Sequence, residues 1–260
     1  MLRIMRSEII RLMRPSLIVG GIGSMAGASG VATLIGFAAA GKSGPGPGQY
    51  IPTEAALAAP DGYIAGLMLA ANLIGIAALT VWAIATATDF SSGMVRLLAQ
   101  AEPRRWRLIV GKVLALVLFT LVGALAATLA AAGTAAACAP AFGISTSAWA
   151  DAVPTLLETF RNVALAATAW GAIGLLIALV TRSAGVAIAV GIGYLVVLEN
   201  MIVAAISEPP KWLLGTTLTA LAAGGTPAVP FETAAWQGLA YIVGCVLAAV
   251  AVTHFREITD

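Results

Sequence analysis

Residues 89–107 read DFSSGMVRLLAQAEPRRWR and form a polar stretch between two long apolar runs of the chain. The chain has fourteen basic residues, and four of them lie in this stretch: Arg96, Arg104, Arg105 and Arg107. Its middle has the spacing of a short amphipathic helix that presents Met94, Leu97 and Leu98, and Pro103 ends it. The polar stretch therefore divides the chain into apolar segments before and after it.

The composition is that of an integral membrane protein. The 260 residues are 60% hydrophobic and only 10% charged, with a mean hydropathy of +0.97, whereas soluble domains carry about 25% charged residues. One histidine and two cysteines leave little material for a metal site or a disulfide framework. We expect no bound metal, and no catalytic set can be assembled around the single His254.

Six apolar runs reach the length of about 20 residues that a helix needs to cross a bilayer. They cover residues 17–40, 63–88, 108–138, 157–180, 184–206 and 235–254. Each is expected to be helical, because lipid cannot satisfy the open edge of a strand. The sequence thus predicts an all-α integral membrane protein with six transmembrane helices in a single domain over residues 1–260.

The basic residues are distributed unevenly between the two sides of these spans. Three lie on one side: Lys42, Arg161 and Lys211. Eleven lie on the other: Arg3, Arg6, Arg11, Arg14, Arg96, Arg104, Arg105, Arg107, Lys112, Arg182 and Arg256. Cytoplasmic segments carry the excess of Lys and Arg, so both termini and the polar stretch are predicted to be cytoplasmic.

Residues 1–14 have the pattern of an amphipathic helix lying in the membrane interface. One face is apolar and consists of Leu2, Met5, Ile9, Leu12 and Met13. The basic residues lie opposite or at its edge, and they are Arg3, Arg6, Arg11 and Arg14. We expect an elbow helix with its arginines among anionic lipid headgroups, broken by Pro15 before the first span.

Residues 36–43 read GFAAAGKS and match the phosphate-binding P-loop pattern letter for letter. That mechanism needs a strand before the loop and a helix after it. Here an apolar helix precedes the motif, and the Gly/Pro-rich segment 44–48 follows it. We therefore reject nucleotide binding at this position and expect Gly41 to end the first helix.

Residues 207–230 form the one loop on the outer side that is apolar in its middle. Pro209 and Pro210 end the fifth span, and residues 211–221 are then apolar but too short to cross the membrane. Two interpretations stay open. The segment is either a re-entrant helical hairpin that dips into the outer leaflet, or a surface loop with one amphipathic turn.

Polar side chains inside the spans are costly and are functional candidates by default. Glu199 and Asn200 lie late in the fifth span, about 24 Å from its cytoplasmic end near Ser183. Glu199 either lines the outer half of a translocation path, or its carboxylate snorkels outward or bonds to a neighbouring helix. Asn72, in the second span, is a candidate for the same path or for a bond between helices.

Small residues four apart allow close packing of membrane helices. Two such pairs occur in the first two spans, Gly23 with Gly27 and Gly62 with Gly66. In a chain so rich in Gly and Ala, these pairs are weak indicators of any particular interface.

The polar stretch is predicted to form a helix from about Ser91 to Ala101, with Asp89 or Ser91 as its N-cap. A cytoplasmic helix that exposes Leu and Met is a docking element for a protein or for the membrane surface. The alternative is a plain connector whose arginines only set the topology.

The chain resembles the ABC type-two permeases, the membrane subunits of many bacterial export systems. The resemblance rests on Met1-Leu2-Arg3, Arg6-Ser7-Glu8 and Arg11 at the start of the chain. It continues at Asp89-Phe90-Ser91-Ser92-Gly93, Leu97-Leu98, Pro103-Arg104-Arg105 and Gly111-Lys112. Asp89 stands where Glu is usual and Met94 where Thr is common, which leaves the subfamily open.

This resemblance implies an exporter permease in the bacterial cell membrane, with residues 89–105 as the coupling helix seated in a separate ATPase subunit. The partners would be two ATPase copies, which bind ATP and Mg, and a second permease subunit in a homodimer or heterodimer; no nucleic acid is expected. The coupling residues would be Asp89, Ser91, Gly93, Met94, Arg96, Leu97, Leu98, Pro103, Arg104 and Arg105. A gradient-driven transporter and a non-transporting anchor or immunity protein remain alternatives.

Overall fold

The structure is a computed structural model that describes residues 2–41, 52–93, 105–151, 153–206 and 211–255. Within these ranges the chain is helical and contains no β-strand, which confirms the predicted all-α class. Six helical segments are long and apolar enough to cross a membrane: Pro15–Ala39, Gly62–Ser91, Trp106–Ala141, Pro154–Thr181, Ala184–Ala205 and Phe231–His254. Their bounds agree with the predicted spans to within four residues.

The N-terminal third begins with α1 (Leu2–Leu12), which ends before a turn at Met13 and Arg14. Pro15 then opens α2 (Pro15–Leu17), as expected for a residue that starts helices but cannot continue one. The π-helical segment η1 (Ile18–Ile22) and α3 (Gly23–Ala39) complete the first span. After α4 (Glu54–Ala58) and the short 3-10 helix η2 (Gly62–Ile64), the long helix α5 (Ala65–Ser91) forms the second.

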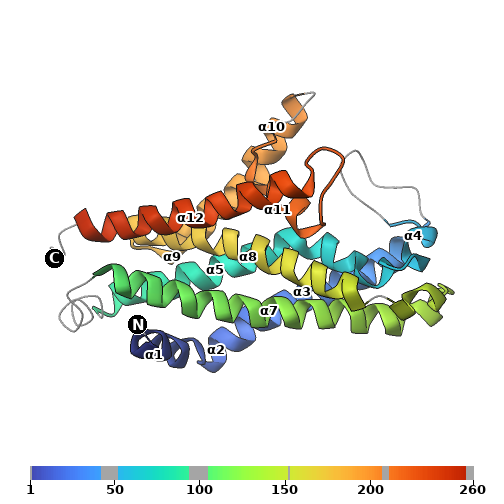
Figure 1. The fold of residues 1–260 in the computed structure, drawn as a ribbon, viewed down its shortest axis with the longest axis horizontal. Helices are drawn as coiled ribbons and strands as arrows, with labels where there is room; N and C mark the ends of the chain where they lie inside the picture. The colour runs from blue at the N-terminus through green and yellow to red at the C-terminus, as the bar shows by residue number, and fades with distance from the viewer. Residues whose placement is uncertain (1, 42–51, 94–104, 152, 207–210, 256–260) are drawn as a thin grey trace.

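The remaining elements are α7 (Arg105–Ala141), η3 (Ser147–Asp151), α8 (Val153–Thr181), α9 (Ala184–Gly193), the π-helical η4 (Tyr194–Glu199), α10 (Asn200–Ala205), α11 (Leu214–Ala222) and α12 (Phe231–Phe255). The long helices lie side by side in an elongated bundle (Figure 1). Helix α1 lies at the same end of the bundle as the last turn of α12, and α4 lies at the opposite end. Helix α10 projects away from the bundle (Figure 1).

Helices α5 and α8 form the centre of the bundle. A tryptophan of each helix packs against a glycine of the other. A Cβ atom on Gly75 would lie 2.2 Å from Trp170, and one on Gly171 would lie 2.5 Å from Trp82. Both tryptophans are fully buried. The indole N–H of Trp82 donates to Thr120 Oγ1 of α7 at 2.9 Å, so the buried ring has its polar atom satisfied.

The two predicted pairs of small residues behave differently. A Cβ atom on Gly66 would lie 1.9 Å from Thr33 Oγ1, so this glycine allows close contact between α3 and α5. Gly62 is equally crowded, by the backbone of Leu57. Gly23 and Gly27 have open space where a side chain would be, so in this chain they face no neighbouring helix.

The segment that resembles a P-loop starts inside α3, because residues 36–39 belong to the last turn of that helix. A helix therefore stands where nucleotide binding would need a strand. Gly41 follows with φ of +71°, the left-handed conformation that a glycine adopts at the end of a helix. Lys42 and Ser43 lie outside the described residues.

Candidate functional site

Helix α1 lies against the start of α7, and the sequence explains the contact. Met5, Ile9 and Leu12 on its apolar face pack against a cluster from α5 and α7 that includes Ile109 and Val113. Leu12 of the predicted apolar face is buried, and Met5 and Ile9 are half-buried. Ile10 of α1 and Met13, which follows the helix, have largely exposed side chains.

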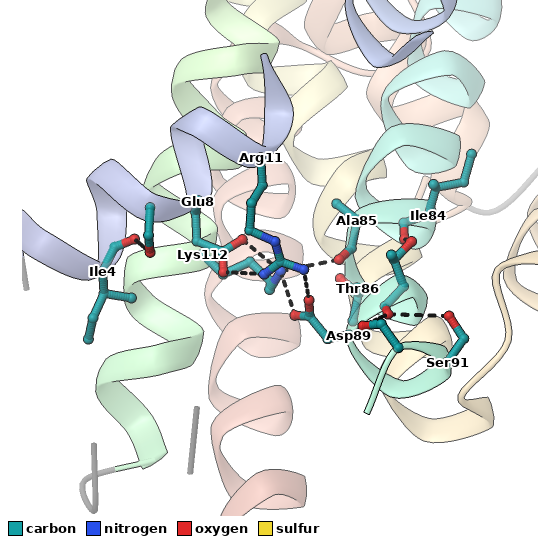
Figure 2. A network of polar contacts seen from close by, with 12 residues as sticks. Ile4, Glu8, Arg11, Ile84, Ala85, Thr86, Asp89, Ser91 and Lys112 are labelled. Atoms are coloured by element: carbon teal, nitrogen blue, oxygen red, sulfur yellow. Dashed lines mark hydrogen bonds and ion pairs between the residues drawn. The ribbon is translucent and has the colours of Figure 1, made fainter. Parts of the chain in front are cut away.

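Four charged residues meet where α1, α5 and α7 come together, and they form a closed ring of alternating sign (Figure 2). Arg11 donates to Glu8 Oε1 at 2.9 Å and to Asp89 Oδ1. Lys112 Nζ lies 2.9 Å from Glu8 Oε2 and 2.8 Å from Asp89 Oδ2. We call Glu8, Arg11, Asp89 and Lys112 the charged ring.

Each oxygen of the two carboxylates contacts a different cationic group of the charged ring. The third N–H of Lys112 donates to the backbone carbonyl of Ala85 at 3.2 Å, so the ammonium uses all three donors. Glu8, Asp89 and Lys112 are buried. Burial of single charges is costly, and it is tolerated here because the two positive and two negative charges compensate each other.

The pKa of Arg11 is raised above its ordinary value. Burial by itself lowers the pKa of a guanidinium, but the hydrogen bond and charge of Asp89, together with those of Glu8, outweigh this effect. Arg11 therefore remains charged at every pH at which the protein is handled. The charged ring thus keeps this positive charge permanently.

The charged ring borders the polar stretch on both sides. Asp89 lies in the last turn of α5, and Lys112 lies about 10 Å into α7. Next to Asp89, the ring of Phe90 is covered by the guanidinium of Arg182, whose carbon lies 5.8 Å from the ring centroid. The end of α5 is therefore held by α1 and α7 on one side and by the α8–α9 connection on the other.

The predicted N-cap at Asp89 or Ser91 is wrong. Helix α5 continues through both residues, the Asp89 carboxylate is bound in the charged ring, and the Ser91 hydroxyl donates to the carbonyl of Thr88. The helix ends at Ser91, and Gly93 follows two residues later with φ of +66°. Arg105 starts α7, and the other predicted coupling residues lie outside the described residues: Met94, Arg96, Leu97, Leu98, Pro103 and Arg104.

The four arginines predicted to face lipid headgroups do not share one environment. Arg6 and Arg14 are exposed. Arg11 points into the charged ring and is part-buried. Arg3 belongs to α1.

The predicted path residues lie in the other half of the molecule. Glu199 is buried and bonds to a neighbouring helix: it accepts the N–H groups of Gly215 and Thr216 at the start of α11. Asn72 accepts the Thr219 hydroxyl of α11 at 3.0 Å, so it also joins two helices. The exposed Asn200, the first residue of α10, donates to the carbonyls of Leu195 and Val196 in the preceding η4.

Sequence reasoning missed the charged ring as a unit. Glu8 and Lys112 entered only as parts of a resemblance, and no contact between them was predicted. A usable signal was present in the sequence. Glu8 lies one helical turn before Arg11, the second span ends near Asp89, and the third span begins near Lys112. Comparison of the sequence with protein-family models finds no match, and comparison with curated proteins finds no similar protein.

Proposed function

We propose that this chain is the membrane-spanning permease subunit of an ATP-driven exporter of the ABC type-two kind. In this proposal it moves an amphipathic or hydrophobic substrate outward across a bacterial cell membrane. Two copies of a separate ATPase subunit supply the energy, and a second permease subunit completes the pathway. Both termini and the polar stretch lie in the cytoplasm.

The charged ring is the observation that carries the proposal. A partner that pushes or pulls on residues 94–104 acts on the end of α5 and the start of α7, the two helices that the stretch connects. Both helix ends are bonded to α1 through the ring. A force on the polar stretch is therefore transmitted to three helices together, which is what coupling to an external ATPase requires.

The helical architecture supports an external source of energy. The segments that join the six helices are all far shorter than a nucleotide-binding domain, and the segment resembling a P-loop begins in a helix. Transport driven by an ion gradient would depend on Glu199, and both of its carboxylate oxygens are occupied by hydrogen bonds to α11. The geometry therefore favours the ATP-driven alternative.

The test is a double substitution in the polar stretch, Arg96→Glu with Leu97→Asp. The tagged full chain is purified from its native membrane in mild detergent, and ATP hydrolysis by the purified complex is measured. We expect the unmodified chain to bring an ATPase subunit with it. The double variant should insert into the membrane normally and lose both the ATPase subunit and the hydrolysis.

A matched control carries the same chemical changes near the C-terminus, Arg256→Glu with Ile258→Asp. It changes the net charge equally and should retain the ATPase. Hydrolysis that survives the change at Arg96 and Leu97 would contradict the proposal, as would an unmodified complex that contains no ATPase.

A further inference from the structure

Helix α11 begins without a capping residue of its own. Its N-cap position is Leu213, which makes no side-chain hydrogen bond to the helix. The first N–H groups of a helix have no partner within it and are normally satisfied by side chains or water. A short helix of nine residues that is buried in the bundle therefore needs its cap from elsewhere.

The cap comes from η4, in the second half of the fifth span. The N–H of Leu214 donates to the Tyr194 hydroxyl at 3.2 Å. The next two N–H groups donate to Glu199: Gly215 to Oε2 at 2.7 Å and Thr216 to Oε1 at 2.5 Å. The Thr216 hydroxyl adds a contact of 2.8 Å to the same oxygen. The negative charge also lies at the positive end of the helix dipole.

The π-helical form of η4 is what brings the two capping side chains together. In an α-helix, residues five apart point in directions about 140° apart. The i to i+5 hydrogen bonding of a π-helix brings such residues closer to one side of the helix. Tyr194 and Glu199 are the first and last residues of the π segment. The π-helical form therefore helps to direct both side chains to the start of α11.

Gly215 provides the space for the carboxylate. A Cβ atom at this position would lie 2.5 Å from Leu195 Cδ1 and 2.7 to 2.8 Å from the two oxygens of Glu199. Side-chain atoms cannot approach each other so closely. Glycine is therefore required for the cap to close, independently of any change at Glu199.

The cap is the polar attachment of η4 to α11, and the apolar contacts of η4 with the core of the bundle come from Tyr194 and Leu195 at its start. Helix α10 contains no buried residue, and Glu199 is the buried residue of η4. The side chains next to Glu199 are half exposed or more: Val196, Val197, Leu198 and Met201. By contrast, α11 is fixed to the bundle by the hydrogen bond from the Thr219 hydroxyl to Asn72 of α5. The Tyr241 hydroxyl of α12 also donates to the carbonyl of Trp212, just before α11, at 2.7 Å.

We propose that Glu199 and Tyr194 form a latch that holds η4 to the start of α11 and so fixes the direction of α10, and that the latch opens and closes as a two-state element. In the closed state η4 is π-helical and caps α11. In the open state the cap is released, η4 returns to α-helical register, and α10 changes its position relative to α12. The role of this movement in opening the outer end of a permease rests on the proposed function, whereas the latch itself does not.

The latch is tested by the distance between α10 and α12. Nitroxide labels are attached at Met201→Cys and Trp236→Cys, two exposed positions, after Cys138→Ala and Cys245→Ala. The full chain is placed in lipid nanodiscs and diluted with unlabelled chain, so that pulsed EPR reports pairs within one chain. The unmodified latch should give mainly one distance, that of the closed state.

Two independent substitutions should open the latch. Glu199→Gln removes the charge and leaves a single oxygen to accept hydrogen bonds, so the ratio of open to closed chains should rise about tenfold or more. Gly215→Ala should raise the ratio of open to closed chains by a similar factor, although residue 199 is still glutamate. Tyr194→Phe removes one uncharged acceptor and should give a smaller rise, about threefold.

Matched controls make the same chemical changes away from the latch. Glu232→Gln alters an exposed carboxylate, and Gly244→Ala alters a helical glycine with open space around it; neither should change the distances. The latch is refuted if Glu199→Gln and Gly215→Ala both leave the distances unchanged in chains that elute as folded protein, or if the unmodified chain is already spread evenly between the two states. Since no ATPase or substrate is present, this outcome is separate from failure of the permease proposal.

Discussion

Glu8 and Lys112 lie 104 residues apart in the sequence, and their side chains form a buried ion pair of 2.9 Å between α1 and α7. The pair is half of a closed set, because Arg11 and Asp89 complete the charged ring. Removal of one member leaves an uncompensated charge, whereas removal of two opposite charges does not. This difference gives the charged ring a distinctive response to mutation.

Lys112→Met should destabilise the protein strongly. It leaves two carboxylates with Arg11 as the one remaining cation of the charged ring, and breaking a buried ion pair from one side costs about 3–5 kcal/mol. Unfolding of the purified chain in mixed micelles, followed by circular dichroism during denaturant titration, measures the loss.

The double variant Glu8→Gln with Lys112→Met tests the explanation. It restores charge balance, with Arg11 facing Asp89, so it should be more stable than Lys112→Met alone. If the two substitutions instead add their separate losses, the charges do not act as a ring.

Arg11 should contribute the same stability from pH 6 to pH 9. Because its pKa in the folded protein is raised, its contribution is complete below the ordinary pKa of a guanidinium and is lost only as the pH rises through the still higher folded value. The measurement is the difference in melting temperature between the unmodified chain and Arg11→Gln across this range. A difference that shrinks as the pH rises toward 9 would contradict it.

The spans and the short buried helix α11 could be predicted from the sequence because both follow from local run length. Residues 211–221 are apolar and flanked by prolines, and most of them form the single helix α11, whereas the choice between a re-entrant hairpin and a surface loop stays open. The bounds of the spans follow equally from where the apolar runs end. These features depend on neighbouring residues, which a single sequence displays.

The charged ring and the cap of α11 were not predicted, because they join residues far apart in the chain. Arg11 and Asp89 are 78 residues apart, and Glu199 and Gly215 are 16 apart with a turn of the chain between them. From spacing within one helix, Arg11 was predicted to face lipid headgroups. The same reasoning left the partner of Glu199 undecided. Pairings of this type depend on how whole helices pack.

Thr120→Val should destabilise the core by about 1–3 kcal/mol, because it leaves the buried indole N–H of Trp82 without an acceptor. The substitution preserves the shape of the side chain, so the cost arises from the unsatisfied donor. Thr128→Val is the matched control: its hydroxyl is also buried in α7 and bonds to a carbonyl of its own helix. Denaturant titration should show a loss for the first variant and little change for the second, and equal losses would contradict the assignment.

Gly75→Ala should destabilise the contact between α5 and α8, although alanine favours helix formation. The added Cβ would lie 2.2 Å from Cδ1 of Trp170, a ring that is fully buried and cannot move aside. Overpacking of this kind costs about 1–3 kcal/mol. Gly27→Ala is the matched control, since nothing lies within 4 Å of a Cβ atom there. A lower melting temperature for Gly75→Ala, with no decrease for Gly27→Ala, would show that the glycine at position 75 is needed for packing; equal stability of the two variants would mean that Trp170 can shift and that the centre of the bundle is less tightly packed than its geometry indicates.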